Sequence, residues 1–66
     1  MKRREFVKHL VRERCLFVRE GGRHSIFFNP ETKRSSTVPR HNDIDALLAR
    51  KICRDLGVRE PKSRGK

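Results

Sequence analysis

The sequence predicts a small two-layer α+β domain in which one helix is followed by three strands and a second helix, the order α-β-β-β-α. Apolar residues recur at helical spacing near both ends of the chain, whereas the middle has short apolar runs separated by turn residues. Such elements can bury their apolar faces if two helices pack on one face of a three-stranded antiparallel sheet. We therefore expect a single thin core between a sheet and a pair of helices.

The first helix is predicted over residues 2–14. Its apolar stripe has the spacing i, i+1, i+4, i+5 and consists of Phe6, Val7, Leu10 and Val11. Neither Gly nor Pro interrupts the segment, and charged side chains surround the stripe. His9 is expected to face solvent.

Three short strands are predicted in the middle of the chain, over residues 16–20, 23–29 and 35–38. Gly21 and Gly22 separate the first two, and consecutive glycines suit a two-residue hairpin loop that needs positive φ at both positions. A turn cluster at 29–33 precedes the third strand. Pro39 ends that strand because it has no N–H to donate to a ladder.

The second helix is predicted to begin at Asn42 or Asp43, since either side chain can cap exposed N–H groups. Its apolar face would be formed by Ile44, Leu47, Leu48, Ile52 and Leu56. Gly57 stands where a left-handed residue often ends a helix. The domain is therefore predicted to span residues 1–58. Residues 59–66 have little to bury and are expected to form a disordered basic tail.

The charge balance favours a polyanionic partner. Lys and Arg total 18 against 8 Asp and Glu, which gives a formal net charge of +10 in only 66 residues. This excess suits RNA, DNA, an anionic membrane or an acidic protein, and does not choose among them. A domain of this size buries only roughly 60% of its unfolded surface, so it has no room for a deep substrate cavity. Any chemistry must take place on a shallow face.

The two cysteines indicate neither a zinc site nor a secreted scaffold. Cys15 and Cys53 are far apart in sequence and form no Cys-x-x-Cys or Cys/His pattern with metal-ligand spacing. Buried, reduced thiols are the first expectation, with a disulfide left open, and they fit a cytoplasmic protein. The basic start is not followed by the apolar stretch of a signal peptide, and no run is long enough to span a membrane. We expect neither metal nor cofactor.

Several motifs in order resemble the HicA toxin family. The run 20–27 contains Gly-Gly-x-His, the stretch 38–41 reads Val-Pro-Arg-His, and 49–57 together with the opening Lys-Arg-Arg-Glu match the same pattern. The resemblance covers residues 1 to about 58. It implies a fold like that of double-stranded-RNA-binding domains and a metal-independent endoribonuclease that cleaves mRNA and arrests translation. It also implies a HicB-type antitoxin as partner.

The residues themselves point to RNA chemistry at His24. This histidine opens a strand directly after Gly21 and Gly22, where the absence of side chains lets a phosphate backbone approach closely. Imidazole exchanges protons near neutral pH, and RNA supplies its own nucleophile in the 2′-OH. By residue type alone, a histidine at the end of a strand is more often a structural residue bonded to a backbone carbonyl. The Gly-Gly-x-His context and the family resemblance together make His24 the expected catalytic residue. The RNA-binding residues would be the two glycines of the turn with cations on the sheet surface, namely Gly21, Gly22, Arg19, Arg23, Lys33 and Arg40.

Side-chain alternation in this strand leaves two possibilities open. His24, Ile26 and Phe28 share one face of a regular strand, and the last two resemble core residues. Either the strand twists or bulges near Gly22, or Phe27 is the core residue and the other two are partly exposed. The phenylalanines, including Phe17, are expected mainly in the core, because the chain has only four.

Two other functions compete with a ribonuclease toxin. One is a non-catalytic RNA-binding module of the same fold, which would have no need of an imidazole beside the turn. The other is a small DNA-binding or ribosome-associated basic protein, for which the acidic Asp45 near the start of the second helix is unfavourable.

The role of His41 is open among three possibilities. It is a second acid/base group, a phosphate contact or, as we favour, a locally hydrogen-bonded residue. Glu20 is expected to be a surface charge.

Overall fold

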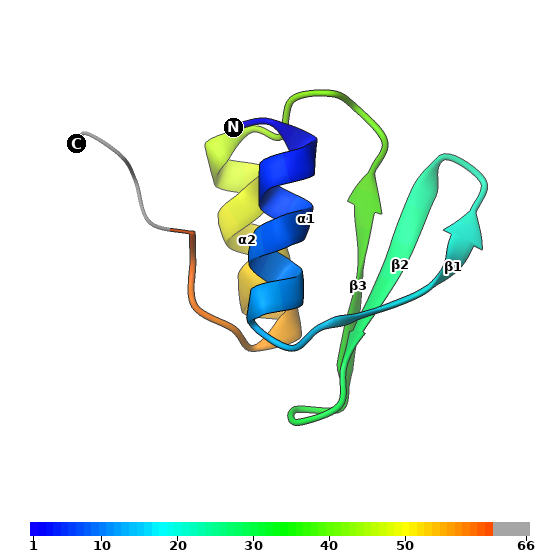
Figure 1. Ribbon diagram of the computed structural model, residues 1–66, viewed down its shortest axis with the longest axis vertical. Helices are drawn as coiled ribbons and strands as arrows, with labels where there is room; N and C mark the ends of the chain where they lie inside the picture. The colour runs from blue at the N-terminus through cyan, green and yellow to red at the C-terminus, as the bar shows by residue number, and fades with distance from the viewer. Residues whose placement is uncertain (62–66) are drawn as a thin grey trace.

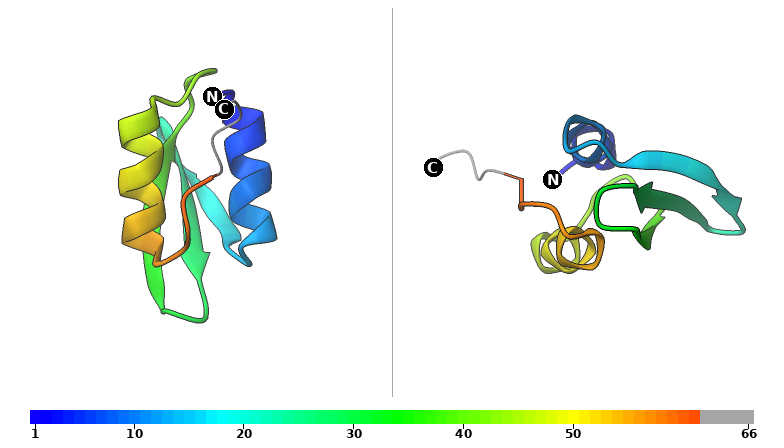
Figure 2. Two further views of the ribbon diagram at one scale, coloured as in Figure 1. Left: turned by 90° about the vertical axis from the view of Figure 1, so that its left-hand side faces the viewer. Right: turned by 90° about the horizontal axis from the view of Figure 1, so that it is seen from below.

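The computed structural model describes residues 1–61 and has the predicted element order. The elements are α1 (Arg3–Arg12), β1 (Leu16–Gly21), β2 (His24–Asn29), β3 (Arg34–Pro39) and α2 (Ala46–Leu56). The three strands form one antiparallel sheet in the order β1-β2-β3, and both helices lie on one side of it (Figures 1 and 2). The predicted two-layer α+β architecture is confirmed.

The core lies between the helices and the β2–β3 part of the sheet. It contains Phe6, Leu10, Cys15, Phe27, Val38, Ile44, Ala49, Ile52, Cys53 and Leu56. The helical stripes are narrower than predicted, because Val11 is 59% exposed and Leu47 is 69% exposed. Each helix buries only the residues that point directly at the sheet or at the other helix.

Strand β1 lies at the edge of the sheet, away from both helices (Figure 1). All of its residues except Gly21 are exposed, and Phe17 is 54% exposed. The expectation that Phe17 belongs to the core is therefore wrong. Its ring instead packs edge-on against Phe27, with 5.8 Å between centroids. The helices are too narrow a layer to cover a third strand.

The start of α2 differs from the prediction by three to four residues. The segment before it pairs with the N-terminus instead, through a bridge between Lys2 and Asp43 and a 2.7 Å bond from the Ile44 N–H to the Met1 carbonyl. The cap is Asp45, whose carboxylate accepts the Leu47 N–H at 3.2 Å. A contact between distant parts of the chain thus delays the helix beyond its first capping residue.

The chain after α2 folds back against α1. Gly57 has φ 75° and ends the helix as predicted. The Arg59 carbonyl then lies 2.8 Å from Nε2 of His9, and the Arg59 guanidinium lies 3.6 Å from the Glu13 carboxylate. His9 is consequently buried, and its expected solvent exposure is wrong. The predicted disordered tail thus begins with ordered contacts, and its residues 62–66 lie outside the described residues.

Both cysteines are free and buried, as expected of reduced thiols. Burial raises the pKa of the Cys53 thiol to about 11 and also raises the pKa of Cys15. Neither thiol is therefore poised as a nucleophile at neutral pH. Within residues 1–61, neither helix is long and apolar enough to cross a membrane.

Candidate active site at the glycine turn

The hairpin loop between β1 and β2 consists of Gly22 and Arg23, one residue later than predicted. Gly21 still belongs to β1, where it is paired with His24, the first residue of β2. Of the three residues Gly21, Gly22 and Arg23, only Gly22 has positive φ, at 66°. A two-residue loop with glycine at its first central position has the pattern of a type II′ turn.

His24 lies on the open face of the sheet. Burial alternates along β2, with Ser25, Phe27 and Asn29 buried toward the helices and His24 exposed on the opposite face. This decides between the two possibilities left by the sequence: Phe27 is the core residue, while Ile26 and Phe28 are partly exposed. The structural alternative for His24 is a hydrogen bond to a backbone carbonyl. Among residues 1–61, it is His9, not His24, that has such a partner.

A bulge in β1 brings Arg19 to the same face as His24. The register pairs Phe17 with Phe27 and Arg19 with Ile26, which leaves Val18 without a partner. In a regular ladder Arg19 would stand opposite the buried Ser25 and face the helices. The extra residue instead places Arg19 opposite Ile26, on the open face.

A polar network centred on the buried Ser25 holds this end of the sheet together. The Ser25 hydroxyl, only 1% exposed as a residue, accepts from Nη2 of Arg3 at 2.6 Å and donates to Oε2 of Glu20 at 3.0 Å. Nε of Arg3 also donates to the Pro39 carbonyl at 2.9 Å, and Arg40 lies 3.5 Å from Oε1 of Glu20. Sequence reasoning missed this network; its only signal was Ser25, a hydroxyl at a helix-facing strand position.

The structure brings most of the predicted site residues to one end of the molecule. Arg23 is exposed in the turn beside His24, and Arg40 directly follows Pro39, the β3 partner of His24. Lys33 is the exception, since it occupies the β2–β3 turn with φ 60°, at the opposite end of the sheet (Figure 1). The expected participation of Lys33 in one cluster with His24 is not observed.

The backbone of the turn is bare at Gly22, whereas the Ile26 side chain partly covers it at Gly21. A Cβ added to Gly22 would meet nothing within 4 Å, and one added to Gly21 would lie 3.2 Å from Cδ1 of Ile26. A phosphate can therefore approach the turn without meeting a side chain of either glycine. Arg40 and Glu20 are both about half exposed, so their ion pair is weak and leaves the guanidinium able to turn toward an anion.

Among residues 1–61, His24 is the only histidine of the hairpin formed by β1 and β2. His41 is exposed in the segment between β3 and α2. In the part of the chain that the structure describes, no three His, Cys, Asp or Glu side chains are grouped so that they could hold a metal ion. The site thus consists of one exposed imidazole, nearby guanidinium groups and a bare turn.

Comparison with known proteins identifies the family. The profile of the family described as "HicA toxin of bacterial toxin-antitoxin" matches residues 3–58. No curated protein and no solved structure matches the chain. The family match includes both helices, all three strands and the turn that precedes His24. The chain therefore belongs to the HicA toxin family of bacterial toxin–antitoxin systems.

Proposed function

We propose that this HicA-family toxin is an endoribonuclease that cleaves mRNA and arrests translation, with His24 as its proton-transferring residue. The observation that carries the proposal is the placement of an exposed imidazole on an open sheet face, beside a bare turn and with Arg19 on the same face. A shallow basic face suits a long, flexible polyanion. The free thiols Cys15 and Cys53 fit action in the cytoplasm.

The proposed reaction uses the substrate's own nucleophile. Neutral His24 accepts the proton of a ribose 2′-OH while the 2′-oxygen forms a bond to the adjacent phosphorus. The bond from phosphorus to the 5′-oxygen breaks, and that oxygen takes a proton from water, which reaches this exposed face. The hydroxide that remains takes the proton from His24, which returns to its starting form. The products carry a 2′,3′-cyclic phosphate and a 5′-hydroxyl. Guanidinium groups of Arg19, Arg23 and Arg40 would stabilise the negative charge that develops on the phosphoryl oxygens.

The nature of the product ends tests this route. In EDTA, the wild-type protein should cut RNA to 2′,3′-cyclic phosphate or 3′-phosphate ends, because no step needs a metal ion. His24→Ala should cut at least about 10²-fold more slowly, the low end for loss of a general acid/base group. Circular dichroism controls for folding. 3′-Hydroxyl ends, a strict Mg²⁺ requirement or equal cutting by a folded His24→Ala would refute the mechanism. RNA binding without cleavage would favour a non-catalytic binding module.

Membership of a toxin–antitoxin family implies an antitoxin partner, and we propose that it is a HicB-type protein with an acidic toxin-binding surface. It would cover His24 together with Arg19, Arg23 and Arg40, and so compete with RNA for the same end of the sheet. Such charge complementarity acts mainly on the association rate.

Charge reversal at the turn tests this interface. Arg23 is exposed in the loop, so Arg23→Glu should leave the fold intact and slow antitoxin association, and added salt should slow the wild-type association in the same way. Stopped-flow or surface-plasmon measurements give the two rate constants separately. Inhibition from a remote site would be indicated if Arg23→Glu bound the antitoxin at the wild-type rate, or if the complex still cut RNA as fast as the free toxin.

A further inference from the structure

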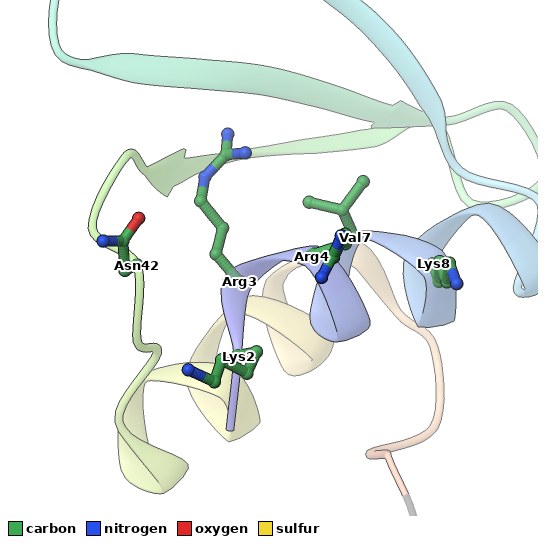
Figure 3. Close-up of a pocket in the computed structure, with 6 residues that line it drawn as sticks. All are labelled: Lys2, Arg3, Arg4, Val7, Lys8 and Asn42. Carbon is green, nitrogen blue, oxygen red and sulfur yellow. The ribbon is translucent and has the colours of Figure 1, made fainter.

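A basic groove lies at the N-terminal end of α1. Its volume is about 600 Å³, and it is lined by Lys2, Arg3, Arg4, Val7, Lys8 and Asn42 (Figure 3). Four of these six residues are cationic and none is acidic. We call this set of residues the cationic groove. It lies outside the set of residues assigned to the glycine turn.

Three of the four cationic side chains of the groove, those of Lys2, Arg4 and Lys8, are available to a ligand. The five ion pairs among residues 1–61 involve the cations Arg14, Arg40, Arg50, Lys51 and Arg59. Lys2, Arg4 and Lys8 are exposed and take part in none of them. Unpaired cations around one concave surface raise the local concentration of a polyanion and release its counterions on binding.

The groove is joined to the strand that follows the glycine turn. Figure 3 shows Arg3 extending from the start of α1 toward the end of a strand. Its guanidinium donates to the Pro39 carbonyl at 2.9 Å and to the Ser25 hydroxyl at 2.6 Å. Pro39 is the ladder partner of His24. Neighbouring strands lie about 4.8 Å apart, so the groove begins close to the backbone of the proposed catalytic residue.

We propose that the cationic groove is a second RNA-binding subsite, which binds backbone phosphates of the strand that continues beyond the cleaved bond. This rests on the proposed function. The cationic groove lies on the helix side of the sheet and His24 on the open face, but both are at the same end of the molecule (Figure 1). A single RNA strand that passes over that end could therefore contact both. Contacts from lysine and arginine side chains to phosphates position a nucleic acid without reading its sequence. The subsite therefore adds affinity that does not depend on sequence.

A second pocket provides a matched comparison. It has a volume of about 330 Å³ and is lined partly by Arg50 and Arg54 of α2, but it also contains Glu60, whose carboxylate lies 3.5 Å from Arg50. Arg50 and Arg54 are four residues apart on an exposed helix surface, as are Arg4 and Lys8. Removing either pair lowers the net charge by the same amount.

The experiment compares Arg4→Gln/Lys8→Gln with Arg50→Gln/Arg54→Gln, both made in full-length His24→Ala so that the RNA stays intact. Fluorescence anisotropy measures the affinity for a single-stranded RNA of about 20 nucleotides at several salt concentrations. The groove variant should bind at least about 10-fold more weakly, and its salt dependence should be shallower by about one unit of slope for each lost phosphate contact. The α2 variant should lose much less.

Equal losses in the two double variants would show that only net charge matters and would overturn the subsite. A groove variant that binds as tightly as its His24→Ala parent would do the same. Failure of the proposed function has a different signature: the protein carrying the native His24 would bind RNA in a groove-dependent way and yet leave it uncut. The subsite would then stand as the binding surface of a non-catalytic module.

Discussion

Ser25 stands between two residues of the open face, yet its own hydroxyl is buried and has two partners. It accepts from Arg3 and donates to Glu20, and these three residues come from α1, β1 and β2. Buried polar groups that keep their partners cost little, whereas one left without a partner carries its full desolvation cost. We infer that Ser25 positions the end of the sheet on which His24 is exposed, and takes no direct part in chemistry.

Replacing Ser25 with Ala should therefore affect both stability and activity. Arg3 and Glu20 would lose the atom that joins them, and we expect the free energy of unfolding to fall by about 1–3 kcal/mol. RNA cleavage should slow in a folded sample because Arg40 and the strand end lose their common support. Urea denaturation and cleavage assays on the same preparation measure the two effects. An Ala variant as stable and as active as the wild type would show that the network is dispensable.

At the scale of elements, the bulge in β1 decides which side chains accompany His24. Val18 has no partner in β2, and the residues after it are shifted by one position relative to a regular ladder. Arg19 consequently lies on the open face, while Glu20 stands opposite Ser25 and accepts a hydrogen bond from its hydroxyl. A single unpaired residue thus places the Arg19 side chain on the open face and the Glu20 side chain toward Ser25.

Deleting Val18 tests this assignment. The deletion joins Phe17 directly to Arg19 and leaves Arg19 opposite Ile26, so the open face should keep its cation and RNA affinity should be unchanged. Arg19→Ala is the matched control and should weaken RNA binding. Anisotropy reports the affinity, and NMR contacts between Arg19 and Ile26 report the register. If the deletion weakened binding as much as Arg19→Ala, the bulge itself would be required for the site.

At the scale of the whole molecule, a thin core carries a large positive charge. Among residues 1–61, ten hydrophobic residues are buried, and the chain has a formal net charge of +10. Like charges repel one another most in the compact state, so the positive charge that favours the proposed RNA substrate also destabilises the fold. Binding of the proposed RNA substrate or of an acidic antitoxin would relieve this repulsion and add stability by mass action.

Salt should therefore act on folding and on RNA binding in opposite directions. Raising NaCl from about 50 mM to about 200 mM screens repulsion among the cations and should raise the melting temperature of the free protein. The same change should weaken RNA binding, because releasing the counterions of RNA into a more concentrated salt solution is less favourable. Thermal unfolding followed by circular dichroism and anisotropy titrations measure the two responses. A melting temperature that fell with salt would show that ion pairs stabilise the fold more than repulsion destabilises it.

The sequence by itself determined the order of the elements, the residue that ends α2 and the position of His24 after a glycine turn. These features depend on local signals, since side-chain period follows from backbone geometry and glycine permits left-handed conformations at Gly22 and Gly57. The family motif is equally local, because it is a short run of residues at fixed spacing.

Only the tertiary structure decided which residues share a face or an end. The bulge at Val18 places Arg19 beside the open face, and the two ends of the sheet separate Lys33 from His24. Packing of the chain after α2 buries His9, and pairing with the N-terminus delays α2 beyond Asp43. Strand register and contacts between distant residues set these outcomes, and a change of one position moves a side chain to the opposite face. The periodicity of apolar residues along the chain contains no information about strand register or about contacts between distant residues.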